Sequence, residues 1–313
     1  MNKKYKVPIL ILVYYTTSLS LGFFTTFFLS KNAYNFRFPL FKSSLQNLVH
    51  FFITTIILKI NKEEIKGDRF LYTTIPCAIT GAIDIGLSSF SLRTVTLAFY
   101  TMVKSSAPVF ILLSGFAFGI EKPSIMFFLI IFTIGAGVFM TSMKNTSFDP
   151  KGFTLISAAS FMAGFRWAFI QYLLEKRKVI NGGLHSTIRD LCLPISCILF
   201  IMSSQVEGIY EILNSEFFNN SRSACINLGL ITLSGILSFT LVYSEFLLVS
   251  ETSVVFLSVS SIVKELVIII VSLYRKEIQL SLLNYSGLLI SIIGILCYNL
   301  KRRKRPEIIE IEE

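Results

Sequence analysis

Two lysines, Lys104 and Lys264, lie within stretches that are otherwise apolar enough to cross a membrane. Placing an ammonium group in the hydrocarbon core of a bilayer costs about 2.5–3.5 kcal/mol on insertion scales. Such a group is retained where it faces a water-filled cavity, a counter-charge or an anionic ligand. One lysine falls in each half of the chain, so the pair predicts a clamp for an anion near the middle of the membrane.

Lys104 has neighbours that fit a binding role. It lies about 8 residues into its predicted helix, roughly 12 Å from the end, which is close to the reach of a lysine side chain. A lysine that only anchors the helix end is therefore the alternative. Pro108 removes the amide that would bond the Lys104 carbonyl, so the helix should kink there. Tyr100 lies one turn back on the same face. We expect Lys104 and Tyr100 to contact the substrate and Pro108 to shape or gate the site.

Lys264 lies deeper, about 12 residues from either end of its predicted helix, which is too far for its ammonium group to reach the membrane surface. An internal ion pair with the adjacent Glu265 is the alternative. Neighbouring residues on a helix point roughly 100° apart, so these two side chains do not face each other well. We therefore favour Lys264 as a substrate contact, with Glu265 as a structural or gating residue beside it.

A third cation, Arg166, lies in the middle of another apolar stretch. Its guanidinium group suits a phosphate because it can donate two parallel hydrogen bonds. The alternative is a structural ion pair with Asp84, a carboxylate deep in an earlier stretch, and the sequence leaves both open. Tyr243 lies where a phenol could donate to a phosphate or stack on a base, although an aromatic side chain in an apolar helix more often only packs.

The composition places the chain in a membrane. Hydrophobic residues make up 53% of its 313 residues and charged residues only 15%, and the mean hydropathy is +0.68. A soluble domain would have about 25% charged residues. The sequence therefore predicts an all-α polytopic membrane protein with ten transmembrane helices, at 7–29, 39–59, 70–90, 96–119, 124–143, 152–174, 186–206, 224–244, 252–274 and 281–300.

The chain divides near residue 148 into two sets of five predicted helices, 7–148 and 149–300. An odd number of helices per half inserts the second half upside down relative to the first, as in inverted-repeat transporters. Lys104 and Lys264 fall in the fourth helix of each half, and the substrate site of such proteins lies between the repeats near the midplane. We expect one transmembrane transporter domain over 1–313, with a charged tail at 301–313.

Lysine and arginine side chains predict the orientation of these helices. With ten predicted helices, both termini lie on the same side of the membrane. The loops on that side contain more lysine and arginine than the loops on the opposite side, and such an excess marks the cytosolic side. Both termini are therefore expected in the cytosol, including the tail at 301–313. The net charge of +10 comes mostly from cations beside helix ends, so it does not predict binding to nucleic acid.

The sequence contains no catalytic pattern. Its five cysteines lack metal or redox spacing, and it has no Ser/His/Asp grouping, HExxH motif or phosphate-binding P-loop. We therefore expect no enzyme activity, no catalytic residue, no metal and no cofactor. The expected partners are a small anionic substrate and membrane lipid, and a homodimer is left open.

These residues also carry a family resemblance. The stretch Thr96–Lys122, with its K-S-S-x-P-V-F core, is similar to the triose-phosphate and nucleotide-sugar transporter families of the drug/metabolite transporter superfamily. Asp84–Ser88 and Arg166-Trp167 with Gln171 match as well, and the likeness covers most of the chain. It most resembles the solute-carrier branch of Golgi proteins that includes candidate GDP-fucose transporters.

The resemblance implies a ten-helix antiporter that exchanges an organic phosphate for another phosphate compound. In the plastid members, lysines at the positions of Lys104 and Lys264 hold the phosphate. An arginine and a tyrosine that line the same site correspond to Arg166 and Tyr243. Those members have an arginine after the second lysine, whereas this chain has Glu265, which argues against a plain exchanger of triose phosphate and phosphate.

Two hypotheses follow for the function. The first is a secondary antiporter that exchanges a nucleotide sugar or sugar phosphate for a nucleoside monophosphate or phosphate across a Golgi or ER membrane. Substrate would offset the repulsion and desolvation of the two lysines, so an empty carrier would cross slowly. The second is a non-transporting membrane protein of the same fold that binds a partner in the glycosylation machinery.

Overall fold

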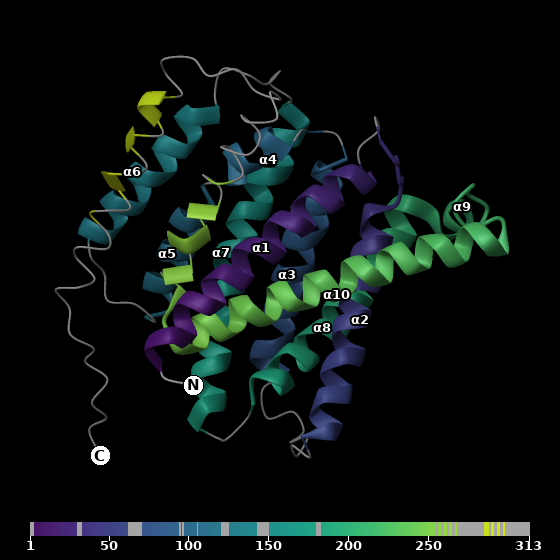
Figure 1. The fold of residues 1–313 in the computed structure, drawn as a ribbon, viewed down its shortest axis with the longest axis horizontal. Helices are drawn as coiled ribbons and strands as arrows, with labels where there is room; N and C mark the ends of the chain where they lie inside the picture. Colours follow the sequence, from purple (N-terminus) through teal and green to yellow (C-terminus); the bar gives the residue numbers. More distant parts are fainter. Residues whose placement is uncertain are drawn as a thin grey trace.

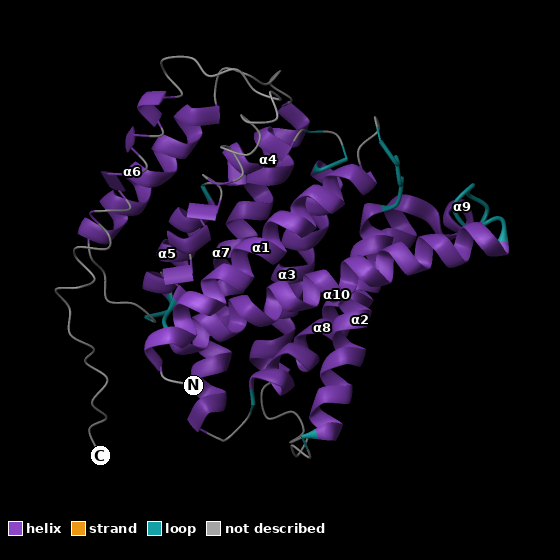
Figure 2. Cartoon of the chain, viewed as in Figure 1, coloured by secondary structure: helices purple, strands orange, loops and turns teal. Residues whose placement is uncertain are grey.

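The computed structural model describes residues 3–29, 33–61, 71–93, 95, 97–104, 106–119, 125–142, 150–179 and 183–254, and then 256, 257, 259–261, 263, 264, 267, 285–287, 289, 290, 293, 294 and 297. Every regular element in these residues is a helix (Figure 2). The all-α prediction is therefore confirmed for this part of the chain. The ninth and tenth predicted helices lie largely outside the described residues, as do Glu265 and the tail at 301–313.

The described helices follow the predicted ones closely. They are α1 (Lys3–Leu29), α2 (Pro39–Ile60), α3 (Leu71–Ser91), α4 (Leu97–Lys104), α5 (Ala107–Ala117), α6 (Ile125–Ser142), α7 (Pro150–Val179), α8 (Leu184–Ser203), η1 (Ser204–Gly208), α9 (Ile209–Leu213) and α10 (Ser221–Glu251). The predicted helix at 96–119 is divided into α4 and α5, and the one at 224–244 continues to residue 251.

Five helical stretches in the described part are long and apolar enough to cross a membrane. They are Val7–Leu29, Pro39–Ile60, Pro150–Glu175, Leu184–Leu213 and Ser221–Glu251. A helix of about 20 residues spans the hydrocarbon core of a bilayer and satisfies its own backbone there. The chain is therefore a multi-pass membrane protein.

The long helices pack in pairs that join the two halves of the chain (Figure 1). α1 lies along α10, α2 along α8 and α3 along α7, while α5 also packs on α7. α6 lies at one edge of the bundle beside α4 and α5. Each of the three pairs takes one helix from residues 7–148 and one from 149–300, so the two halves share an extensive interface.

Glycines allow a close approach between helices at two places in the described bundle. A Cβ built on Gly164 of α7 would lie 2.7 Å from the carbonyl oxygen of Phe110 on α5. One built on Gly235 of α10 would lie 3.1 Å from Val49 of α2. Lipid tails are as apolar as leucine, so helices in a bilayer associate through such close van der Waals packing rather than through the hydrophobic effect. These glycines therefore let the paired helices come together.

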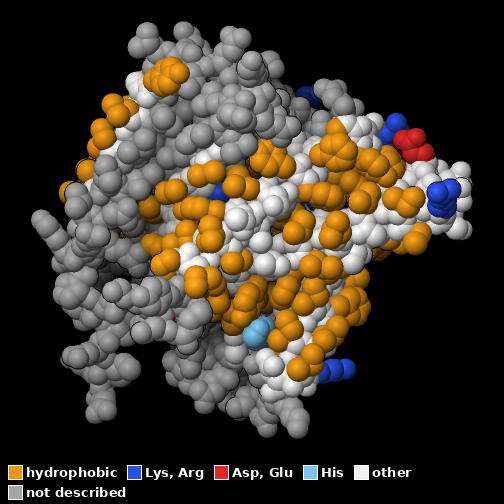
Figure 3. All heavy atoms as spheres, in the orientation of Figure 1, with side chains coloured by type: hydrophobic (Ala, Val, Ile, Leu, Met, Phe, Trp, Pro, Cys, Tyr) orange, Lys and Arg blue, Asp and Glu red, His pale blue; other side chains and the backbone are white. Residues whose placement is uncertain are grey.

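The face formed by α1 and α10 is covered with hydrophobic side chains (Figure 3). Leu12 and Phe27 of α1 are 64% and 60% exposed, and Leu233 of α10 is 51% exposed. An apolar surface of this extent is unfavourable in water and favourable against lipid acyl chains. In the same view, charged side chains gather near the end of the bundle that carries α9. The α1–α10 face is therefore a lipid-facing surface.

Candidate functional site

The helix that carries Lys104 is interrupted at this residue. α4 ends at Lys104 and α5 begins at Ala107, with Pro108 in the first turn of α5. The Ser106 amide donates to the Val103 carbonyl at 3.1 Å, which is a tighter turn than that of an α-helix. Proline is favourable in the first turn of a helix because its missing N–H would have no partner there. The break that the proline predicts is therefore present, and it leaves Lys104 at a helix end.

Asp84 of α3 binds two cations at once. Lys104 donates from Nζ to Oδ1 of Asp84 at 2.6 Å. Arg166 of α7 donates to Oδ2 through Nη2 at 2.9 Å and through Nε at 3.0 Å. Ser88, one turn after Asp84, accepts a hydrogen bond from Lys104 at 3.1 Å and donates to Oδ1 at 3.4 Å. Each carboxylate oxygen therefore has its own cation, and the two cations come from opposite halves of the chain.

This geometry bears on two alternatives that the sequence left open. Arg166 forms the ion pair with Asp84 that was one of its two interpretations. Lys104 extends to Asp84, which is not the arrangement of a lysine that only anchors a helix end. The sequence led us to expect that substrate offsets the repulsion and desolvation of Lys104 and Lys264. In the structure the Asp84 carboxylate already lies against the Lys104 ammonium group.

The three groups differ in how far solvent or solute can reach them. The Asp84 side chain is 4% exposed, whereas those of Lys104 and Arg166 are 17% and 18% exposed. A buried carboxylate is unfavourable unless it is paired and hydrogen-bonded, and Asp84 is both. The cations keep N–H groups beyond those that Asp84 accepts, because lysine has three and arginine five. They are therefore the groups of this cluster that a second anion can contact.

The packing of α3 on α7 holds Arg166 in place. A Cβ on Gly81 of α3 would lie 3.1 Å from Cδ of Arg166, so glycine makes room for the arginine stem. The guanidinium carbon lies 4.6 Å from the centroid of the Trp167 ring, within cation–π distance. The Cys77 thiol donates weakly to the Arg166 carbonyl at 3.7 Å. These contacts fix the guanidinium group where it meets Asp84.

Lys264 belongs to a second charged cluster. Its Nζ lies 5.1 Å from the centroid of the Tyr14 ring on α1, a cation–π contact. It also interacts electrostatically with Glu245 of α10. The ion pair with Glu265 that was the alternative for Lys264 lies outside the described residues and stays a prediction.

Glu245 is a candidate site residue that the sequence prediction missed. The eighth helix was expected to end at residue 244, which would have left Glu245 in a loop. That boundary is wrong, because α10 continues to Glu251. The run Phe246–Val249 that follows Glu245 is fully apolar, and this run is the signal that indicates a longer helix.

The two clusters are neighbours. The carboxyl group of Glu245 interacts electrostatically with Arg166 and Asp84 as well as with Lys264. Together with Lys104, the described residues of the candidate site include three cations and two carboxyl groups. Cations in such a partly buried place attract an anion more strongly than they would in water. Ammonium and guanidinium groups are also the usual protein partners of phosphate.

The two candidate tyrosines are engaged in packing. Tyr243 stacks on His185 with ring centroids 5.4 Å apart and on Phe239 at 6.1 Å. It lies two residues before Glu245 on α10, so the two side chains point to nearly opposite sides of that helix. Tyr100 packs against an apolar cluster between α4 and α7. The packing interpretation of Tyr243 is therefore realised, and a substrate role for either tyrosine stays a prediction.

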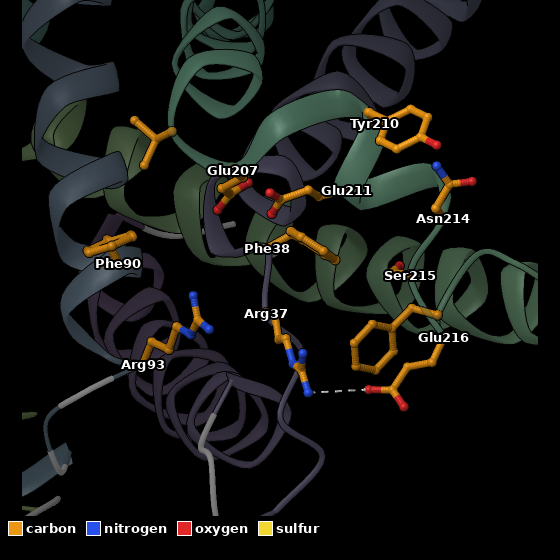
Figure 4. A pocket seen from close by; sticks show the side chains of 12 residues that line it. Arg37, Phe38, Phe90, Arg93, Glu207, Tyr210, Glu211, Asn214, Ser215 and Glu216 are labelled. Atoms are coloured by element: carbon orange, nitrogen blue, oxygen red, sulfur yellow. Dashed lines mark ion pairs between the residues drawn. The ribbon is translucent and has the colours of Figure 1, made fainter.

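A separate hollow of about 750 Å³ lies at one end of the bundle (Figure 4). Its charged lining residues have both signs, and they are Arg37, Arg93, Glu207, Glu211 and Glu216. Arg93 follows Asp84 by nine residues and lies just beyond the end of α3 at Ser91. The hollow is therefore displaced from the Asp84 cluster toward the end of the bundle.

One carboxylate of this hollow has a structural task. Glu207 of η1 accepts hydrogen bonds from the amides of Leu40 at 2.7 Å and Phe41 at 2.9 Å, and from the Ser203 hydroxyl at 2.7 Å. The first amides of a helix lack partners within it, and a negative charge there also suits the helix dipole. Glu207 therefore caps α2 from a distant part of the chain.

Comparison with known proteins gives these features a context. An Arabidopsis thaliana protein named "Probable sugar phosphate/phosphate translocator" is 32% identical over 306 residues, which cover 94% of this chain and 72% of the relative. A Saccharomyces cerevisiae protein named as a candidate nucleotide-sugar transporter is 24% identical, and the match covers 93% of this chain and 83% of the relative. A solved crystal structure has a similar fold, with a TM-score of 0.64 at 13% identity over 97% of this chain and 99% of that chain.

A family model covers nearly the whole chain. The model of the Triose-phosphate Transporter family matches residues 5–299. This range includes the Asp84 cluster, Glu245 and Lys264, and the match confirms the resemblance that the sequence motifs carry. The chain therefore belongs to the triose-phosphate transporter family.

Proposed function

We propose that the protein is a secondary antiporter that exchanges a nucleotide sugar or a sugar phosphate for a nucleoside monophosphate or phosphate across a Golgi or ER membrane. The observation that carries this proposal is the group of three cations, Lys104, Arg166 and Lys264, inside a helical bundle of a transporter family. A phosphate or pyrophosphate has the charge and the hydrogen-bond acceptors that these cations attract. The names of the Arabidopsis and yeast relatives support a sugar phosphate or nucleotide sugar as the substrate class.

In this proposal the fold has ten transmembrane helices in two inverted repeats, 7–148 and 149–300. A repeat of this kind relates the five predicted membrane helices of the first half, in order, to the five of the second half. It therefore relates α1 to α7, α2 to α8 and α3 to α10. Under this relation the packed pair α1–α10 corresponds to the packed pair α7–α3, and the pair α2–α8 corresponds to itself. All three pairs occur in the packing, which supports the repeat. The ion pair between Asp84 and Arg166 lies between the two halves, where such transporters bind substrate.

The proposed roles follow from position. Lys104, Arg166 and Lys264 would neutralise the phosphate, and Tyr14 would orient Lys264 from α1. Tyr100 and Tyr243 would contact the remainder of the substrate after a movement of their helices. Pro108 would let α4 and α5 move separately, because the helix is already divided there.

The proposed compartment and the proposed orientation in the membrane are inferred from the sequence. The Golgi or ER membrane follows from the likeness to the Golgi branch of the superfamily. Cytosolic termini follow from the distribution of lysine and arginine. An epitope at each terminus, probed with antibody after selective permeabilisation of the plasma membrane, tests both points. Epitopes that react only after the organelle membranes are opened would contradict the orientation.

Transport itself is tested in liposomes that contain the purified full-length protein. The liposomes are preloaded with GMP, UMP, phosphate or buffer and offered a panel of labelled nucleotide sugars and sugar phosphates. We expect uptake of one class of substrate, stimulated by one class of internal phosphate compound. Uptake no higher than in empty liposomes for every combination, with protein that is folded and inserted, would contradict the proposal and favour the non-transporting binding protein.

A further inference from the structure

The Asp84 carboxylate occupies hydrogen-bond donors that a phosphate would use. It accepts from Lys104 at 2.6 Å and from two nitrogen atoms of Arg166 at 2.9 and 3.0 Å. Lys104 gives a second hydrogen bond to Ser88. Carboxylate and phosphate oxygens bind these donors in the same way, through short charge-assisted hydrogen bonds. Part of the binding capacity of both cations is therefore already taken by a group of the protein itself.

Charge makes the carboxylate and a bound phosphate compete. A phosphate held by Lys104 and Arg166 would bring its negative oxygens close to Asp84. Asp84 is almost completely buried, so water screens the repulsion poorly. The side chains of Lys104 and Arg166 are partly exposed and have N–H groups beyond those that Asp84 accepts, so a phosphate can contact them while Asp84 competes for the rest.

We infer that Asp84 is an internal counter-anion, which competes with the phosphate of the substrate for Lys104 and Arg166 and pairs with both cations in the empty carrier, where it offsets one of their two positive charges. This inference rests on the proposed function and adds to it a built-in competitor of the substrate. It predicts the direction in which anion affinity changes when the Asp84 charge is removed. Removal of the Asp84 charge should strengthen anion binding, whereas a carboxylate that only holds the cations in position would, when removed, let them separate and so weaken binding.

The inference also changes the expected coupling of transport. A carrier with two bare cations would have to move them through a low-dielectric bundle when empty, which is strongly unfavourable. With Asp84 in place, both cations keep an ion-pair partner after the substrate leaves, and one of their two positive charges stays offset. The empty protein should therefore change between its two orientations more readily than a variant without this carboxylate. The rate of net transport without counter-substrate would then depend on the Asp84 side chain, because this carboxylate lets the empty carrier return.

The binding experiment uses the purified full chain in detergent and inorganic phosphate as the probe. The thermal unfolding temperature is measured against phosphate concentration, and its half-saturation gives an apparent Kd. We expect Asp84→Asn to bind phosphate with a Kd at least about fivefold lower than that of the unaltered protein. Asp190→Asn is the matched control, because Asp190 of α8 pairs with its neighbour Arg189 at 4.0 Å. Its Kd should equal that of the unaltered protein.

A second comparison covers the case in which Asp84→Asn does not fold. Arg166→Gln removes one cation, and Arg166→Gln with Asp84→Asn removes that cation and the carboxylate together. Lys104 is then the one cation of the cluster in both proteins, paired with Asp84 in the first and unpaired in the second. The double variant should bind phosphate more tightly than Arg166→Gln. Equal or weaker binding in the double variant would overturn the inference.

The transport experiment measures labelled phosphate uptake into liposomes that contain either unlabelled phosphate or buffer. The ratio of uptake into buffer-loaded liposomes to uptake into phosphate-loaded liposomes reports how easily the empty carrier returns. We expect Asp84→Asn to lower this ratio at least about fivefold, while Asp190→Asn leaves it unchanged.

The outcomes separate the inference from the proposed function. Phosphate transport by the unaltered protein, together with a Kd in Asp84→Asn that is unchanged or raised, would overturn the inference and leave the proposed function standing. A folded, unaltered protein that neither binds nor transports phosphate, or any sugar phosphate or nucleotide sugar, would instead overturn the proposed function.

Discussion

Nζ of Lys104, at the end of α4, lies 2.6 Å from Oδ1 of Asp84 on α3. The most unfavourable residue of this stretch in a membrane therefore has a counter-charge within the protein before any substrate arrives. Arg166 shares the same carboxylate from the other half of the chain, so one aspartate links two helices of different halves through charge. Two cations on one carboxylate leave a net positive charge at this cluster, and this charge is what the proposed substrate neutralises.

Replacement of Arg166 by glutamine should destabilise the protein. Asp84 would lose one of its two cations while remaining buried, and the loss of a hydrogen bond to a charged group costs about 1.5–3 kcal/mol. Arg37→Gln is the matched control, because its ion pair with Glu216 spans 3.9 Å between side chains that are 56% and 70% exposed. An exposed pair of this kind contributes about 0–1 kcal/mol. Thermal unfolding in detergent compares the two variants, and an equal loss in both would contradict a special role for the Arg166 pair.

Substitution of Gly164 by alanine should also destabilise the bundle. The added Cβ would lie 2.7 Å from the backbone of Phe110, so α5 and α7 would have to separate. Overpacking of this kind costs about 1–3 kcal/mol. A Cβ on Gly229 of α10 meets nothing within 4 Å, so Gly229→Ala should be neutral or gain up to about 1 kcal/mol in helix propensity. If Gly164→Ala unfolds at the temperature of the unaltered protein, the close approach of these helices is not as described.

Glu207→Ala should weaken the start of α2. The amides of Leu40 and Phe41 would lose their acceptor in a buried place, and the loss of a helix cap costs about 0.5–2 kcal/mol. Glu211 lines the same hollow but is exposed, so Glu211→Ala should leave the unfolding temperature nearly unchanged. Hydrogen exchange at the first amides of α2 provides a local check. Faster exchange in the Glu207 variant alone is expected, and equal exchange in both variants speaks against the cap.

The helical architecture could be predicted from the sequence because hydrophobic stretches of about 20 residues in a membrane have few other structures open to them. The break after Lys104 could be predicted as well, because Pro108 lacks the amide that would continue the helix. The ion pair of Arg166 with Asp84 was one of two interpretations, since both residues are buried charges in apolar stretches. In each case the feature depends on the local sequence, or on a residue type that is rare in apolar stretches, so it can be recognised without the structure.

The remaining site features depend on contacts that the sequence does not display. Glu245 was placed beyond its helix because a charge was taken as the boundary, although the apolar run after it indicates otherwise. Glu207 caps a helix whose first amides lie 167 positions away, and no local pattern reports such a partner. Lys42 is 2% exposed and donates to Thr25 at 3.3 Å, yet near a helix start it resembles an ordinary interfacial lysine. Tertiary packing decides all three.

The most direct test of the central claim is exchange uptake by Lys104→Ala and Lys264→Ala in phosphate-loaded liposomes. Lys59→Ala is the matched control, because Lys59 lies exposed in the last turn of α2. Each site variant loses a charge-assisted contact to phosphate, so we expect its uptake rate to fall about ten- to a hundredfold while the control keeps the rate of the unaltered protein. Uptake at the unaltered rate by either site variant, correctly inserted, would contradict the claim that these lysines hold the phosphate.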